Sequence, residues 1–317
     1  MGAAFLAALF GAGVRARNAL YDSGAIRARS LRGAVVSVGN LSVGGSGKTP
    51  FVILLGELLL ARGVKFDILS RGYGRKSTGV HLVEPGGLPA DFGDEPLLMA
   101  RRLGVPVVVG EDRFAAGEFA EQRFGVRLHL LDDGFQHRQL ARDYDIVLVT
   151  AEDARDQLLP RGRLREPLRA LARADAVVLT SGAEAAKFPL AGKQVWRARR
   201  GIRTDGVSPN PVAFCGIARP KNFFTQLRTA GIEPAAEAVY RDHHAYSELD
   251  IRDLREIRSK SGAGGFVCTE KDAINLGALL PSLEPIAVIP VKMELLDAER
   301  AVAEMLNTLA ERGKPLA

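Results

Sequence analysis

The chain carries at residues 38–50 the stretch Val38-Gly39-Asn40-Leu41-Ser42-Val43-Gly44-Gly45-Ser46-Gly47-Lys48-Thr49-Pro50. An apolar run at 34–38 leads into it and favours a strand, and an apolar stripe with helical spacing over 50–62 follows it. A glycine-rich turn between a strand and a helix, closed by Gly-Lys-Thr, is the pattern of a phosphate-binding P-loop. The stretch therefore predicts a nucleotide-binding α/β domain.

Phosphate contacts in such a loop come from both backbone and side chains. Glycines let the backbone curl so that N–H groups point at phosphate oxygens, and the new helix presents its positive end to the same anion. We expect Lys48 to neutralise phosphate charge and the Thr49 hydroxyl to ligate Mg²⁺. Ser42 stands where the strict pattern has glycine, and a glycine-rich loop without a ligand is the alternative. The predicted nucleotide-binding residues are Val43, Gly44, Gly45, Ser46, Gly47, Lys48, Thr49 and Pro50.

A second apolar run ends in two acids, Asp132 and Asp133. A carboxylate at the carboxyl end of a strand beside a P-loop can reach the Mg²⁺ ion. Strands also end in aspartate at plain turns, and the sequence does not decide between the two acids. Both are candidate metal ligands together with Thr49.

Short, nearly continuous apolar runs recur along the first part of the chain, as is typical of strands buried on both faces. They lie at 66–69, 105–109, 128–131, 146–149 and 176–179. Helical segments alternate with most of them, which predicts a parallel sheet. After a polar stretch at 199–211, further runs at 212–215, 266–269 and 286–289 precede a helix expected over 297–312. We predict an α/β fold with a P-loop NTPase-like parallel sheet domain over 1–200 and a second, smaller α/β domain over 201–317.

Composition narrows the class of protein. The 317 residues are 47% hydrophobic and 25% charged, which is typical of globular proteins. A net charge of +6 indicates an anionic partner, such as a nucleotide, a nucleic acid or a membrane surface, or simply a basic soluble protein. Only 6% of residues are aromatic and no stacking platform is visible, which argues against nucleic-acid binding. Cys215 and Cys268 lie in apolar runs and are expected to be buried thiols in a reducing cytoplasm.

The N-terminal segment, residues 1–14, is apolar and is followed by Arg15, Arg17, Arg27, Arg29 and Arg32. It is shorter than the roughly 20 apolar residues that span a bilayer. No positive charge precedes it, as one would in a signal peptide. A helix lying in the membrane interface on the cytoplasmic side fits this pattern, and an ordinary first helix packed on the core is the alternative.

Three further clusters have two interpretations each. The acids of Gly93-Asp94-Glu95-Pro96 suit either chemistry or the start of a helix, where the dipole favours them. Asp242-His243-His244 suits proton transfer or a surface turn, and as a zinc fragment it lacks further ligands at suitable spacing. The arginine-rich run at 161–167 is either a solvated face or a grip for phosphate or acidic lipid.

Together these motifs resemble the tetraacyldisaccharide 4'-kinase family of the lipid A pathway. No single piece is specific, but the pieces occur in the family's order over about residues 35–275, and the Ser42 departure is shared with the family pattern. The matching runs are residues 39–50, Ser70-Arg71-Gly72-Tyr73-Gly74-Arg75, Gly93-Asp94-Glu95-Pro96, Leu131-Asp132-Asp133-Gly134-Phe135-Gln136-His137, Leu159-Pro160-Arg161-Gly162, Arg165-Glu166-Pro167, Asp242-His243-His244 and Thr269-Glu270-Lys271-Asp272.

The resemblance implies a reaction and a place in the cell. The expected reaction moves the γ-phosphate of ATP, with Mg²⁺, to the 4'-hydroxyl of a tetraacylated glucosamine disaccharide 1-phosphate and gives lipid IV A. The expected place is the cytoplasmic face of the inner membrane, where the N-terminal helix docks as a peripheral or monotopic anchor. Two α/β lobes are expected to close around the nucleotide. The oligomeric state stays undetermined.

The resemblance also implies residue roles. Asp94 would be the base toward the sugar hydroxyl, with His243 as its partner. Lys48 would hold phosphates, while Thr49 and one of Asp132 or Asp133 would hold Mg²⁺. The residues expected close to the substrate or the active site are Arg71, Glu95, Gln136, Arg165 and Glu166.

A P-loop NTPase switch or partner-binding regulator is the competing hypothesis. Such proteins also combine Gly-Lys-Thr with a strand-end aspartate, and residues 269–272 superficially resemble the Asn-Lys-x-Asp motif that reads guanine. This hypothesis predicts hydrolysis gated by a protein partner and no lipid acceptor.

Overall fold

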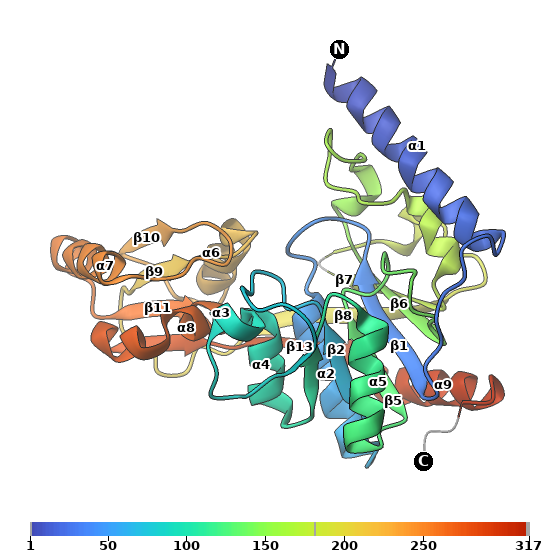
Figure 1. Cartoon of the computed structure of the whole chain (residues 1–317). Coiled ribbons are helices and arrows are strands. Elements are labelled where there is room, and N and C mark those ends of the chain that lie inside the picture. Colours follow the sequence, from blue (N-terminus) through green and yellow to red (C-terminus); the bar gives the residue numbers. More distant parts are fainter. Residues whose placement is uncertain (1, 181, 315–317) are drawn as a thin grey trace.

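The computed structural model describes residues 2–180 and 182–314 of the chain. Met1, where the expected N-terminal segment begins, lies outside the described residues. Figure 1 shows two sheets with their helices lying side by side, and a long N-terminal helix that extends away from them.

Among the described residues, a nine-stranded sheet forms what we term the larger unit. Its strand order is β13-β8-β7-β6-β1-β5-β2-β4-β3. Its strands run parallel except at the two edges, where β13 pairs antiparallel with β8, and β3 with β4. The strands are β1 Ala34–Asn40, β2 Asp67–Ser70, β3 His81–Leu82, β4 Val107–Val109, β5 Leu128–Asp132, β6 Tyr144–Thr150, β7 Ala176–Thr180, β8 Gln194–Ile202 and β13 Val291–Leu296.

A second, wholly parallel sheet with the order β10-β9-β11-β12 forms the smaller unit. Its strands are β9 Val212–Cys215, β10 Ala236–Val239, β11 Phe266–Thr269 and β12 Ile286–Ile289. Successive side chains of a strand point to opposite faces. Phe214 accordingly packs with α7 (Glu248–Ser261) and α8 (Glu270–Leu276), while Cys215 packs with α6 (Pro220–Thr229) on the other face.

Helices cover both faces of the larger sheet, as the alternation of strands and helices predicted. One face carries α2 (Lys48–Ala61), α4 (Asp94–Leu103) and α9 (Ala298–Glu311), and the other carries α5 (Arg113–Phe124). Helix α2 is apolar nearly all round because it contacts β1 and β5 on one side and α4, α9 and β13 on the others. The short helices are α3 Pro89–Phe92 and the 3₁₀ segments Asp153–Arg155, Leu168–Arg173, Ala185–Lys187 and Gly277–Leu283.

Every apolar run singled out in the sequence is a strand in the structure, and both predicted helices are present. Cys215 and Cys268 are buried free thiols, as predicted. The polar stretch at 199–211 differs, because its first four residues belong to β8. Side chains alternate between buried and exposed along that strand, with Trp196 and Ala198 inside, so the polar residues at 199–202 belong to the exposed face of a strand paired with β13.

The chain crosses between the two units twice, which a single division near residue 200 does not describe. After β12 it returns to the larger sheet as β13, and α9 then buries Val302, Met305 and Leu309 in the larger core. The segment 291–311 therefore packs with the larger unit. We propose that the domain that closes over the nucleotide is the smaller unit alone, β9 to β12.

Helix α1 (Gly2–Asp22) is attached to the larger unit by its C-terminal half. Asn18 donates to the buried carboxylate of Glu166 at 2.7 Å, and Arg138 donates to the Asn18 carbonyl at 3.1 Å. Toward the N-terminus Phe5 and Leu9 leave 70% and 61% of their surface exposed. No helix in the described part of the chain is long and apolar enough to cross a membrane.

Candidate active site

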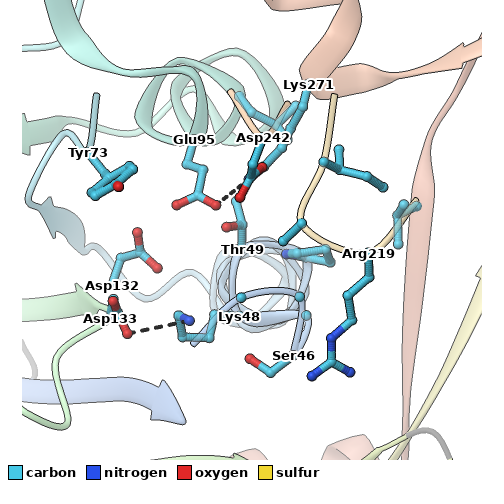
Figure 2. Close-up of a pocket in the computed structure, with 18 of the residues that line it drawn as sticks. Ser46, Lys48, Thr49, Tyr73, Glu95, Asp132, Asp133, Arg219, Asp242 and Lys271 are labelled. Atoms are coloured by element: carbon cyan, nitrogen blue, oxygen red, sulfur yellow. Dashed lines mark hydrogen bonds and ion pairs between the residues drawn. The ribbon is translucent and has the colours of Figure 1, made fainter. Parts of the chain in front are cut away.

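A cavity of about 450 Å³ lies where the carboxyl ends of the central strands of the larger sheet face the smaller unit (Figure 2). Residues 43–50, the whole predicted nucleotide-binding set, line it. Ligands of parallel α/β sheets bind at this edge because the strands deliver their loops there. From the smaller unit the lining includes Ile217, Ala218, Arg219, Asp242, His243, Thr269, Glu270 and Lys271.

The P-loop backbone curls as the glycines predict. Gly44, Gly45 and Gly47 adopt φ values of 72°, 53° and 87°, in the left-handed region of backbone conformation that residues other than glycine rarely occupy. Gly39 is needed for close approach, because a Cβ there would lie 2.5 Å from the Cβ of Phe135. Because Gly39 has no side chain, the turn that follows β5 can pack closely against the end of β1. This packing brings Asp133 of that turn next to Lys48.

Lys48 lies in a charged network at the strand ends. Its Nζ donates to Asn40 Oδ1 at 3.0 Å and lies 3.5 Å from Asp133 Oδ1. Arg165 places its two terminal nitrogens on the Asp133 oxygens, at 3.0 and 2.8 Å. Burial raises the pKa of Asp133, but Lys48 and Arg165 outweigh it and hold that pKa well below its usual range. Asp133 is therefore ionised at any physiological pH and fixes the lysine.

Asp132 has a different environment. Ser70 donates to its Oδ2 at 3.1 Å, while its Oδ1 is buried and has no hydrogen-bond partner among the described residues. Burial, and then the charges of Glu95 and Asp133, raise the pKa of Asp132 to about 7. A buried carboxylate oxygen without a donor, surrounded by like charges, suits a bound cation.

The donor set fits Mg²⁺ held partly by phosphate oxygens. Within residues 2–180 and 182–314, no group of three or more His, Cys, Asp or Glu side chains could hold a metal ion alone. Mg²⁺ is commonly bound by one or two carboxylates plus substrate phosphates. Thr49 lines the same cavity at the start of α2, as a P-loop threonine should.

Asp94 and His243, which are 149 positions apart, form a hydrogen-bonded pair. His243 Nδ1 lies 2.9 and 2.8 Å from the two Asp94 oxygens, and Asn275 donates to Oδ2 at 3.2 Å. Burial raises the pKa of Asp94, but His243 and Lys271 reverse the effect and lower it overall. The hydrogen bond to Asp94 raises the pKa of His243.

The members of this pair are not equally accessible. Asp94 is 3% exposed at the first residue of α4, and His243 lines the cavity. His243 has φ 57°, a left-handed conformation that is uncommon outside glycine and concentrates at functional sites. The imidazole is therefore the member of the pair that faces the cavity.

Glu95 and Lys271 also join the two units across the cavity (Figure 2). The Lys271 ammonium is hydrogen-bonded to Glu95 Oε1. Burial lowers the pKa of Lys271, but the charges of Glu95 and Asp94 raise it overall. Lys271 therefore stays charged. Its ammonium interacts with the two carboxylates of Asp94 and Glu95.

The remaining predicted site residues are placed differently. Arg71 and Arg165 line the cavity, whereas Gln136 and Glu166 do not. Gln136 donates to the Asn40 carbonyl at 2.9 Å and so holds the last residue of β1, the strand that leads into the P-loop. Glu166 is fully buried and accepts from Asn18 and Arg173, so its carboxylate holds α1 and not a ligand.

Residues 269–272 form a helix cap and not a base-reading motif. Thr269 and Asp272 make a reciprocal capping box at the start of α8. The Asp272 carboxylate also accepts from the Gly216 N–H at 2.7 Å and the Tyr246 hydroxyl at 2.8 Å. With these partners it is a buried structural acid.

Several lining residues were not singled out in the sequence as site residues, among them Arg200, Arg219 and Lys271. Arg219 and Lys271 follow β9 and β11, and the rule that parallel strands deliver functional residues at their carboxyl ends could have found them. Arg200 lay in the polar stretch near the predicted domain boundary, and nothing in the sequence indicated that it faces a ligand.

Comparisons with known proteins agree with this geometry. The sequence model of the family described as LpxK, tetraacyldisaccharide-1-P 4'-kinase, matches residues 3–311. The tetraacyldisaccharide 4'-kinase of Koribacter versatilis is 52% identical over 317 residues, covering 97% of this chain and 98% of that relative. The enzyme of the same name from Geobacter metallireducens is 39% identical, covering 93% and 94%. A crystal structure of LpxK from Aquifex aeolicus in complex with ATP superposes with a TM-score of 0.78 at 35% identity, covering 96% of this chain and 97% of that one.

Proposed function

The chain belongs to the tetraacyldisaccharide-1-P 4'-kinase family, and from this membership we propose how its residues share the work of phosphate transfer. It is a kinase that uses ATP and Mg²⁺ to phosphorylate the 4'-hydroxyl of tetraacyldisaccharide 1-phosphate, giving lipid IV A. One observation carries the assignment of residues: the Asp94–His243 pair presents its imidazole to the same cavity as the P-loop. A P-loop alone would suit a switch protein as well.

Nucleotide binding falls to residues 43–50, whose backbone N–H groups and helix end receive the phosphates. Lys48, held by Asn40 and Asp133, supplies a fixed positive charge next to the transferred group. Thr49 with Asp132 or Asp133 would hold Mg²⁺, which neutralises charge on the phosphates. Phosphoryl transfer depends mainly on such positioning and charge neutralisation.

The acceptor hydroxyl must lose its proton as its oxygen bonds to the γ-phosphorus and the bond from that phosphorus to the β-phosphate oxygen breaks. A sugar hydroxyl is a weak acid, so a base within hydrogen-bond range helps late in the transfer. We assign the proton to the Asp94–His243 pair, with Asp94 as its ionised member and His243 as the member presented to the cavity. Asn275 and the Glu95 N–H fix the Asp94 carboxylate in place.

The lipid acceptor gives the N-terminal helix a role. We propose that the exposed face with Phe5, Leu6 and Leu9 enters the cytoplasmic leaflet of the inner membrane, with the following arginines at its head groups. Each buried CH₂ contributes about 0.8 kcal/mol, so three such side chains suffice for reversible attachment when charge adds to them.

The test is transfer of labelled phosphate from ATP to the tetraacyldisaccharide 1-phosphate in detergent micelles. Wild type should phosphorylate the lipid, and Asp94→Ala should lose at least about 100-fold in kcat while ATP affinity stays within a few-fold. Lys48→Ala should lose both activity and ATP affinity. An Asp94→Ala variant with near-normal kcat would remove Asp94 from the mechanism.

A further inference from the structure

Two arginines of the cavity have no role in the chemistry described so far. Arg219 belongs to the smaller unit, in the loop between β9 and α6, and Arg200 lies on β8 of the larger sheet. Both line the cavity beside the P-loop. Arginine side chains with unsatisfied donors are costly to bury, so each needs a partner.

The described residues satisfy these arginines only in part. Arg219 is 13% exposed and forms one ion pair, from its Nη1 to Glu152 Oε2 at 3.1 Å. Its Nε and Nη2 are buried and have no hydrogen-bond partner among the described residues, and the same holds for Arg200 Nε. Burial, and then the nearby charge of Arg219, lower the pKa of Arg200. Two neighbouring cations that line one cavity and have free donors form a site for an anion.

The contact between Arg219 and the P-loop identifies the anion. A Cβ placed on Gly45 would lie 2.6 Å from Arg219 Cδ, and one on Gly44 would lie 3.1 Å from Ala218 Cβ. The arginine stem therefore rests directly on the part of the loop that cradles the phosphates, and Figure 2 shows it running alongside Ser46. Only glycine at position 45 leaves room for this stem.

We propose that Arg219 is a catalytic arginine supplied by the smaller unit, which binds the phosphate chain of ATP and stabilises the charge that develops on it during transfer, with Arg200 as a second contact. The inference rests on the kinase function proposed above. A fork of N–H donors matches phosphate oxygens, and arginines placed this way in other P-loop proteins contribute about 10³–10⁵ in kcat.

Glu152 is a positioning residue in this proposal. It lies just after β6 in the larger unit and pairs with both Arg219 and Arg163. By holding Nη1 it leaves Nε and Nη2 of Arg219 for the phosphate. It also links the smaller unit to the larger one beside the P-loop.

The first experiment measures lipid phosphorylation and nucleotide binding together. Arg219→Ala should lower kcat at least about 100-fold, with ADP affinity changed less than about threefold and tight binding of ADP with aluminium fluoride, a mimic of the transferring phosphoryl group, lost. Arg219→Lys should recover part of kcat because charge returns without the fork. The matched control is Lys221→Ala, an exposed site two residues away that does not line the cavity, and it should behave as wild type.

Several outcomes separate the possibilities. Wild type without lipid phosphorylation would overturn the proposed function itself. Active wild type with Arg219→Ala within threefold of its kcat, or with unchanged binding of the aluminium fluoride complex, would overturn the role of Arg219 alone.

A second variant guards against misfolding of Arg219→Ala. Glu152→Ala keeps Arg219 but removes its ion-pair partner, and it should lower kcat by a smaller factor. That loss should vanish when Glu152→Ala is made in the Arg219→Ala background, because coupled residues are not additive. Independent, additive losses would contradict the positioning role.

Discussion

Two adjacent aspartates at the end of β5 differ because their neighbours differ. Asp133 lies between Lys48 and Arg165 and is held ionised. Asp132 is not part of an ion pair among the described residues, and burial, followed by the charges of Glu95 and Asp133, raises its pKa to about 7. The sequence could not separate these two acids, because the difference depends on burial and on charged residues that are distant in the chain, namely Glu95 for Asp132 and Lys48 and Arg165 for Asp133.

Asp132 predicts a pH dependence of metal binding. Below pH 7 the carboxyl is protonated, and a divalent cation must displace that proton. Affinity for Mg²⁺ in the ADP complex should therefore rise about tenfold between pH 6 and pH 8, as measured by calorimetry. In the Asp132→Asn variant the nucleotide phosphates still titrate, so the part of the pH dependence that they cause should remain. The part of the pH dependence of Mg²⁺ affinity that comes from the Asp132 carboxyl should be lost. Equal affinities at the two pH values in wild type would contradict the assignment.

Strands β2 and β5 are tied together by a buried pair far from the cavity. His129 Nδ1 lies 2.8 and 2.9 Å from the Asp67 oxygens, and its Nε2 lies 3.5 Å from Glu121 of α5. Burial lowers the pKa of His129, but Asp67 and Glu121 raise it overall. Burial raises the pKa of Asp67 as well, although His129 opposes that effect.

This pair predicts a pH-dependent stability. Because the folded pKa of His129 is raised, its contribution is fully present below about pH 6.5 and is lost as pH rises through the folded pKa. His129→Gln should cost about 3 kcal/mol of unfolding free energy at pH 6, and less at pH 9. Urea unfolding measures both, with the exposed His81→Gln as control. A cost that grows with pH would contradict a raised pKa of His129 in the folded protein.

Helix α1 shows how an element can be fixed at one end and free at the other. Glu166, predicted close to the active site, instead holds Asn18 and Arg173, and Arg138 holds the last turn of α1 at Asp22. The sequence reveals the apolar segment but not its anchor. That anchor depends on a hydrogen bond between Asn18 and Glu166, which are 148 positions apart in the chain.

The exposed half of α1 predicts membrane binding. Replacing Phe5, Leu6 and Leu9 together by serine should weaken sedimentation with anionic phospholipid vesicles at least about tenfold, because several apolar side chains no longer enter the bilayer. Activity toward a detergent-dispersed substrate should fall less. Leu249→Ser, at a leucine 67% exposed on α7, controls for surface hydrophobicity in general. Unchanged vesicle binding of the triple variant would assign α1 another role.

At the scale of the whole molecule, the cavity exists only because the two units meet. Asp94 and Glu95 of the larger unit reach His243 and Lys271 of the smaller unit, and Glu152 reaches Arg219. These contacts are polar and surround the cavity, an arrangement that suits units which move relative to each other as nucleotide enters.

The sequence predicted the local parts of this arrangement better than the global ones. The P-loop, the strand-end acids and most strands follow from short patterns. Asp94 and His243 came from the family resemblance, because no spacing rule joins residues 149 apart. The return of β13 to the larger sheet and the approach of Arg219 to Gly45 depend on tertiary packing, which no local pattern encodes.

The most direct test is the position of the new phosphate. Purified protein should convert ATP, Mg²⁺ and tetraacyldisaccharide 1-phosphate into a product whose ³¹P spectrum shows a second phosphomonoester, coupled to the proton at carbon 4' of the distal sugar. Asp94→Asn should leave the starting spectrum unchanged over the same time. Release of inorganic phosphate without this second signal, from wild type that binds ATP, would contradict a 4'-kinase.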